Sequence, residues 1–195
     1  KTDLQAGTLL GGSLALSAGT GFSNAGRVVA DKDGIGLKTA GLLDNSGLLQ
    51  AAGSLDIADM QSGGSESLHN SGKILAGGTM KVKAKDIVSE PGSDADSGWI
   101  QAGTGSVIEA ASLNNQGAWL LSNQDGATDS ITLTGALTNS GTLQSKGSST
   151  LSADTITSSG TLLAAGNLTL GTSNFTTSGN AITQAADRLA LTTTG

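Results

Sequence analysis

The sequence holds few residues whose chemistry could support catalysis. It has 195 residues, a single histidine, His69, and no cysteine. A serine–histidine–aspartate triad therefore has one possible base, and no nucleophile-elbow motif surrounds any serine. The two arginines, Arg27 and Arg188, stand near opposite ends of the chain, so they cannot be expected in one cleft. We predict no catalytic residues and expect His69 to be a solvated surface side chain without metal or triad partners.

Aspartates are the candidate ligands for a metal ion. The segment Asp31–Gly34 resembles the start of a calcium loop, but Ile35 stands where the next oxygen ligand is needed and Leu42 replaces the glutamate of the twelfth position. We predict no metal site and no cofactor, with weak calcium binding in loops as the alternative. The aspartates expected to cluster in loops are Asp94, Asp96, Asp125 and Asp129.

Composition restricts both the fold and the partners. There are 30 glycines, one proline and four aromatic residues, and 13% of the residues are charged, giving a net charge of −6. Collagen is excluded, since glycine does not recur at every third residue and proline is nearly absent. The negative charge gives no footprint for nucleic acid, and the apolar runs are far shorter than the roughly 20 residues of a membrane span. We expect neither nucleic-acid binding nor membrane insertion. We also expect a core that is built from aliphatic side chains, a few from each repeat.

A repeat of about 21 residues organises the chain. Clear copies read LDNSGLLQAAGSLDI from Leu43, LTNSGTLQSKGSSTL from Leu137 and ITSSGTLLAAGNLTL from Ile156. Nine copies fill residues 1–195, which predicts a single repeat segment without a second domain. The copies are aligned on Gly7, Gly26, Gly47, Gly72, Gly98, Gly117, Gly141, Gly160 and Gly179.

The aligned columns alternate in character. The position four before the glycine is apolar except for Asp3 and Asp94, the position two after it is apolar from Leu9 to Ala181, and the position four after it is nearly always small, Leu121 being the large exception. Later in each copy come alternating apolar pairs. Such alternation is typical of half-buried strands, and units this short must stack to bury their apolar side. We predict an all-β, right-handed parallel β-helix of about nine coils with about 20 residues each. The alternating pairs include Met80 with Val82 and Ile131 with Leu133.

The column two before the glycine is mostly asparagine. Asparagines stacked coil on coil can form an amide ladder, and asparagine also tolerates left-handed turns beside a glycine of positive φ. We therefore interpret these residues as structural and not as ligands. The remaining copies carry Gln5, Asp96, Ser158 and Thr177. The structural asparagines are Asn24, Asn45, Asn70, Asn115 and Asn139, and the turn glycines are Gly26, Gly47, Gly72, Gly117, Gly141, Gly160 and Gly179.

Three polar segments interrupt the repeat, at 59–67, 86–97 and 122–130, and we predict them to be surface loops. Trp99 follows its glycine by one residue and should point outward, whereas Trp119 follows by two and should point inward. Trp99, beside the second loop, is the candidate for a binding contact. The alternative is an indole folded back onto its own loop.

The pattern [LF]-x-N-x-G-x-[LIV]-x-A-x-G-x-L-x-[LIV] resembles the filamentous haemagglutinin repeats, most closely over 43–83 and 137–171. These repeats form the shaft of exoproteins of two-partner secretion systems in Gram-negative bacteria, among them adhesins and contact-dependent growth inhibition effectors of the CdiA type. The resemblance implies passage through an outer-membrane secretion pore and a secreted, cell-surface location. The Asn-Pro-Asn motifs of the family's secretion domain are missing, since Pro91 is the only proline. We therefore expect a piece of a longer shaft.

The resemblance implies a monomeric structural shaft that projects a distal binding or toxin region from the cell. One alternative is a direct adhesin that binds a receptor on a host or neighbouring cell through the loops and Trp99. A less favoured alternative is a polysaccharide-degrading β-helix enzyme, which needs a carboxylate-lined cleft. We expect no enzymatic activity.

Overall fold

The computed structural model describes residues 2–59, 67–93 and 97–193. Every regular element in these ranges is a β-strand, and none of the ranges contains a helix that could cross a membrane. Each coil contributes one strand to each of three parallel sheets, which we call sheets A, B and C. The predicted parallel β-helix of about nine coils is thereby confirmed.

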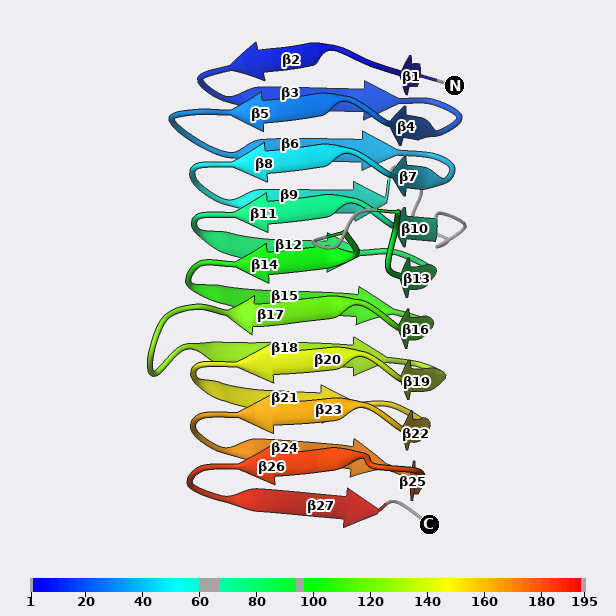
Figure 1. Cartoon of the computed structure of the whole chain (residues 1–195), viewed down its shortest axis with the longest axis vertical. Coiled ribbons are helices and arrows are strands. Elements are labelled where there is room, and N and C mark those ends of the chain that lie inside the picture. Colours follow the sequence, from blue (N-terminus) through cyan, green and yellow to red (C-terminus); the bar gives the residue numbers. More distant parts are fainter. Residues whose placement is uncertain (1, 60–66, 94–96, 194–195) are drawn as a thin grey trace.

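The strands of each sheet stack in chain order along the solenoid (Figure 1). Sheet A contains β1 (Thr2–Leu4), β4 (Phe22–Asn24), β7 (Leu43–Asn45), β10 (Ser67–Asn70), β13 (Asp86–Ser89), β16 (Ser112–Asn115), β19 (Ala136–Asn139), β22 (Thr155–Ser158) and β25 (Asn174–Thr177). Sheet B contains β2 (Thr8–Gly11), β5 (Arg27–Ala30), β8 (Leu48–Ala51), β11 (Lys73–Ala76), β14 (Trp99–Ala102), β17 (Ala118–Ser122), β20 (Thr142–Ser145), β23 (Thr161–Ala164) and β26 (Ile182–Ala185). Sheet C contains β3 (Leu14–Ala18), β6 (Ile35–Thr39), β9 (Leu55–Asp59), β12 (Thr79–Lys83), β15 (Gly105–Ala110), β18 (Thr128–Leu133), β21 (Ser148–Ser152), β24 (Leu168–Thr172) and β27 (Leu189–Thr193).

The coils wind with the predicted right hand. In Figure 1 the near strands of sheet B run to the left and the far strands of sheet C run to the right while the chain descends from its N-terminus. This sense of rotation is the one that right-twisted parallel strands favour.

The interior is built from columns of equivalent residues. On sheet A the backbone register stacks Phe22, Leu43 and Leu68, and on sheet B it stacks Leu49, Ile74 and Ile100. All of these side chains are buried, and one continuous core runs through the coils. Because each side chain lies over its equivalent in the next coil, a core only one coil wide can be filled by aliphatic residues.

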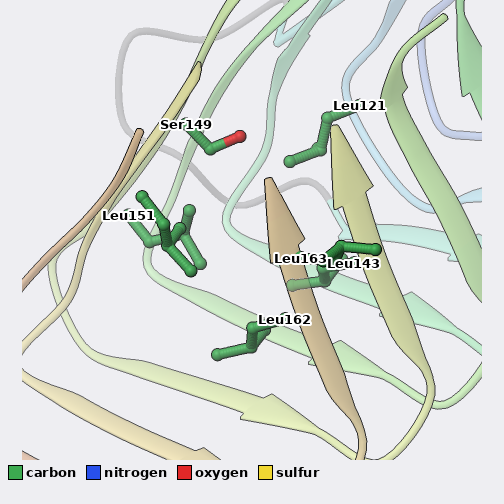
Figure 2. A pocket seen from close by; sticks show the side chains of 7 residues that line it. Leu121, Leu143, Ser149, Leu151, Leu162 and Leu163 are labelled. Carbon is green, nitrogen blue, oxygen red and sulfur yellow. The ribbon is translucent and has the colours of Figure 1, made fainter. Parts of the chain in front are cut away.

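One small pocket lies in the core of the C-terminal half of the chain. Figure 2 shows leucines of several coils gathered around this space together with the hydroxyl of Ser149. The space is too small to admit a water molecule. Its lining residues are Leu121, Leu143, Ser149, Leu151, Leu162, Leu163 and Leu168.

In the first coil the predicted columns after the glycine are confirmed, since Leu9 pairs with Val28 and Gly11 with Ala30, but the columns before it are wrong. Thr2 and not Asp3 pairs with Phe22, and Leu4 and not Gln5 takes the asparagine position opposite Asn24. The cause is a connection from β1 to the next glycine that is one residue longer than in the second coil.

The fifth and ninth coils also differ from the alignment. Ile87 and Ser89 fill the positions that were assigned to Asp94 and Asp96, which lie outside the described residues. In the ninth coil Thr183 and not Ala181 pairs with Leu162. In the fifth coil the alignment fails only before Gly98, and in the ninth only after Gly179, because the connection between the strands is longer there than in the other coils.

The polar segments are shorter than predicted. Residues 60–66 of the first segment lie outside the described residues. In the second, Asp86–Ser89 is strand β13, so the connection begins only at Glu90. In the third, Thr128 already opens strand β18, and the loop is confined to 123–127, where it projects beside β17 in Figure 1.

The column glycines serve close approach between coils. A Cβ added at Gly47 would lie 2.1 Å from the carbonyl oxygen of Gly26, and one at Gly141 would lie 2.1 Å from that of Gly117. The expected positive φ is found at Gly179, in a turn of the ninth coil, but not at the other six predicted turn glycines. No described asparagine adopts positive φ either, so that part of the prediction is wrong.

We expect Gly141→Ala to destabilise the solenoid by about 1–3 kcal/mol, since the new methyl group meets a backbone carbonyl that is itself fixed in the ladder. Chemical denaturation measures the change. The matched control is Gly36→Ala on an outer face, where an added Cβ meets nothing within 4 Å. Equal effects of the two substitutions would contradict the close-approach explanation.

Candidate functional sites along the solenoid

The asparagine column forms a buried amide ladder. The Nδ2 of Asn24 donates to Oδ1 of Asn45 at 2.8 Å, and Nδ2 of Asn45 donates to Oδ1 of Asn70 at 2.7 Å. Asn24 and Asn45 also donate to a main-chain carbonyl of the next coil, Asn45 to that of Lys73 at 3.2 Å, whereas Asn70 donates to the carbonyl of Gly72 in its own coil at 3.3 Å. These side chains are at most 1% exposed, so the amide groups have no access to a ligand from solvent. Their arrangement supports stacking and not binding.

The ladder is interrupted at Ser89. It resumes where Nδ2 of Asn115 donates to Oδ1 of Asn139 at 2.8 Å, and Asn139 donates to the Ser158 hydroxyl at 3.2 Å. Ser89 instead donates to the carbonyl of Gly98 at 3.4 Å. The Oδ1 of Asn115, buried beside it, is left without a hydrogen bond. The fifth coil is thus the weak step in an otherwise continuous column.

Asp129, predicted to lie in a loop, is a buried carboxylate. It lies in β18 and is 0% exposed. Its Oδ1 accepts from the amide of Ser106 at 2.7 Å, and its Oδ2 accepts from the hydroxyls of Ser122 at 2.7 Å and Ser145 at 2.6 Å. Three donors of this kind satisfy a carboxylate without a cation. The earlier expectation that Asp129 could share a calcium site is therefore wrong.

A β-bulge creates this carboxylate site. In β17 the pairing with β20 shifts between Leu120 and Ser122, so that Leu121 and Ser122 both face inward. Ser122 and not Leu121 pairs with Ser145, which corrects the predicted column. The extra inward residue brings the Ser122 hydroxyl within reach of Asp129.

His69 bridges three coils on the outer side of sheet A. Its Nδ1 lies 2.8 Å from Oδ1 of Asp44, and its Nε2 lies 2.8 Å from Oε1 of Glu90. Ionised carboxylates only accept hydrogen bonds, so this geometry is fully satisfied when both ring nitrogens carry a proton and donate. His69 lies on the outer face, as predicted for a surface side chain, but it is half-buried and hydrogen-bonded to two carboxylates and is therefore not fully solvated.

The sequence contained part of the signal for this bridge. Asp44 and His69 both stand three residues before a column glycine, and the register pairs them. The role of Glu90 could not be predicted. Glu90 directly follows β13, whereas the fifth copy was aligned on Gly98, which places other residues at the positions of β13.

The bridge raises the pKa of His69 above its ordinary value of 6.5. Burial is the largest influence and lowers the pKa, but the hydrogen bonds and charges of Glu90 and Asp44 together outweigh it. The charged ring is therefore favoured by folding.

Trp99 lies on the outer face of β14 and is half-buried, while Trp119 points into the core and is 1% exposed. The indole Nε1 of Trp99 donates to Oε1 of Gln101 on the same face at 3.3 Å. Both indoles thus point as their spacing from the glycine predicts. Trp99 presents part of its ring to solvent beside Gln101, and a role in receptor binding remains a prediction.

The other candidate chemistry does not converge. In residues 2–59, 67–93 and 97–193 no group of three or more histidine, aspartate or glutamate side chains is arranged to hold a metal ion. Asp31 and Asp33 are exposed in the turn that precedes β6, and Arg27 and Arg188 lie in the second and ninth coils.

A model of the haemagglutinin repeat family matches the chain three times, over residues 3–90, 61–144 and 144–195. Together these matches span nearly the whole solenoid. The chain belongs to the haemagglutinin repeat family. No curated protein and no solved structure matches it. Haemagglutinin repeats are typical of secreted, surface-associated proteins of a structural or adhesin type.

In this haemagglutinin repeat chain we expect Ser89→Asn to stabilise the fold by about 1 kcal/mol. The new amide would accept a hydrogen bond from Nδ2 of Asn70 and donate one to the unsatisfied Oδ1 of Asn115. The ladder would then be continuous. Thermal unfolding measures the gain, with Val88→Asn on the outward side of the same strand as the control. A stability lower than that of the wild type would contradict the continuous-ladder interpretation.

We expect the His69 bridge to make stability depend on pH. A histidine whose pKa is raised by folding contributes its full stabilisation below pH 6.5 and loses it as pH rises through the folded-state pKa. The melting temperature of the wild type, relative to His69→Gln, should therefore fall as pH rises from slightly acidic to alkaline values. A difference between the two proteins that does not change with pH would rule out the imidazolium.

Proposed function

We propose that this chain is a shaft segment of a secreted bacterial surface protein, and that it holds a distal adhesive or toxin-carrying region away from the cell. The observation that carries the proposal is the unbroken stack of nine coils with one continuous core. At a strand spacing of about 4.8 Å, nine coils give a rod of roughly 40 Å. Membership of the haemagglutinin repeat family supports this mechanical role.

The proposal includes export by the two-partner route through an outer-membrane pore. An absence of cysteine suits a chain that crosses the periplasm unfolded, because oxidation there cannot trap it. Each coil pairs only with its neighbours, so folding can proceed outside the cell as successive coils emerge. Folding would then itself favour outward movement of the chain.

A display experiment tests this proposal. The segment is placed between the secretion domain of a two-partner exoprotein and a carboxy-terminal epitope tag, and is produced together with the matching pore. We expect the tag at the cell surface. Leu143→Asp buries a charge in the core column and should unfold neighbouring coils and reduce display several-fold, whereas Gln144→Asp, next to it on the outer face, should not. Absence of display for the wild type, or equal display for both variants, would refute the proposal.

A direct adhesin is the second candidate function, favoured by the outward position of Trp99 beside the connection that begins at Glu90. This reading expects saturable binding of the purified chain to host or bacterial cells, reduced about tenfold or more by Trp99→Ala. The control is Leu163→Ala on the same outer face. Binding that is absent, or unaffected by Trp99→Ala, leaves the shaft as the function.

A further inference from the structure

The outer side of sheet B differs from the outer sides of the other two sheets. We call its two outward columns the B face. The first column contains Thr8, Arg27, Leu48, Lys73, Trp99, Ala118, Thr142, Thr161 and Ile182. The second column contains Leu10, Val29, Gln50, Leu75, Gln101, Leu120, Gln144, Leu163 and Gln184.

Large apolar residues are concentrated on the B face, although Leu42 and Val107 are exposed elsewhere. On the B face Leu10 and Ile182 are exposed, and the others are half-buried, namely Val29, Leu48, Leu75, Trp99, Leu120 and Leu163. The central outward column of sheet A is polar apart from Val88, and the outward columns of sheet C carry lysine, aspartate, glutamate, serine and threonine with Val107 as their large apolar residue. The B face also has no carboxylate, although the chain carries a net charge of −6. A face that combines large apolar side chains with neutral or basic ones, and carries no negative charge on an acidic rod, indicates a contact surface.

The second column is symmetric about Leu120. From the third coil to the ninth it reads glutamine, leucine, glutamine, leucine, glutamine, leucine, glutamine. We consider a twofold axis that passes through Leu120, lies in the plane of contact and runs along the strands, perpendicular to the rod. This axis would lay the second column of one copy antiparallel on the second column of another copy. Gln101 would then face Gln144 of the second copy, and Leu75 would face Leu163. Leucine then faces leucine and glutamine faces glutamine at all seven levels, and every contact is reciprocal, as in an isologous interface.

The first column is not symmetric in residue type, but it is compatible with the same pairing. Ala118 faces itself at the axis, and Trp99 faces Thr142 of the second copy, where the small alanine beside it leaves room for the indole. Leu48 faces Ile182, and Lys73 faces Thr161. No two like charges meet in the overlap, because Arg27 lies in the second coil, outside it.

We propose that two copies of this chain associate face to face through the B face, antiparallel, with Leu120 on the twofold axis. Seven coils of four-residue strands cover about 34 by 13 Å, so the dimer buries about 900 Å² in total, just below the roughly 1,000 Å² expected of a specific interface. The dimer is therefore reversible and dominates only at high concentration. This pairing goes beyond the shaft function and replaces the expected monomer.

Cross-linking tests the register, since the natural chain has no cysteine. The backbones of facing sheets lie about 10 Å apart, so a short bis-maleimide linker is used in place of a direct disulfide. Leu120→Cys should cross-link to itself with high yield, and Thr150→Cys on sheet C should not. Gln101→Cys and Gln144→Cys should each cross-link poorly alone but well when mixed. Failure of Leu120→Cys, or efficient self-linking of Gln101→Cys, would overturn the proposed dimer.

Sedimentation equilibrium tests the association itself. The mass should rise from 19.0 kDa toward twice that value between micromolar and millimolar concentrations. Leu120→Glu places two carboxylates together at the axis and should weaken dimerisation by at least about tenfold, without changing the melting temperature of the monomer. Thr150→Glu is the control. A monomer at every concentration, or equal association of both variants, would refute the pairing.

Discussion

The parallel backbone ladder fixes successive coils about 4.8 Å apart, and the rest of the structure depends on this spacing. At the corner between sheets A and B it brings the carbonyl of one coil so close to the next that a Cβ at Gly72 would lie 2.2 Å from the oxygen of Gly47. Coil spacing thus accounts for six of the column glycines, whereas Gly7, Gly98 and Gly179 adopt positive φ. The six are Gly26, Gly47, Gly72, Gly117, Gly141 and Gly160. The same spacing places each side chain over its equivalent, so the interior is determined column by column.

Buried polar groups follow the same rule, since their partners must lie in the coil above or below. Asparagine suits such a column, because its amide carries both donors and an acceptor and can bond to the next amide and the next main chain. Where Ser89 replaces it, the Oδ1 of Asn115 remains unsatisfied. Ionised carboxylates cannot bond to one another, and Asp129 is accommodated by the Ser106 amide, the Ser145 hydroxyl and the Ser122 hydroxyl that a bulge adds.

The sequence was sufficient to predict the sheet class, the coil number and most of the core, because a column of Leu43, Leu68 and Leu113 is visible without coordinates. It failed where the turn changed length. Glycine alignment assigned Asp96 to a position held by Ser89, since nothing in a single sequence distinguishes an insertion before the glycine from one after it. The carboxylate of Asp129 was missed because its donors come from three strands, one of them bulged.

The outward columns are free of the interior's constraints, which makes their composition informative. A rod that served only as a spacer would need nothing from these columns except solubility, and apolar residues would be scattered over all three sides. Sheet A instead carries the His69 bridge, sheet C carries the Lys83–Glu109 ion pair, and the large apolar residues are concentrated on sheet B. Because exchange of outward residues between the sheets would leave the core unchanged, stability of the fold does not explain this segregation. A contact on one side of the shaft does.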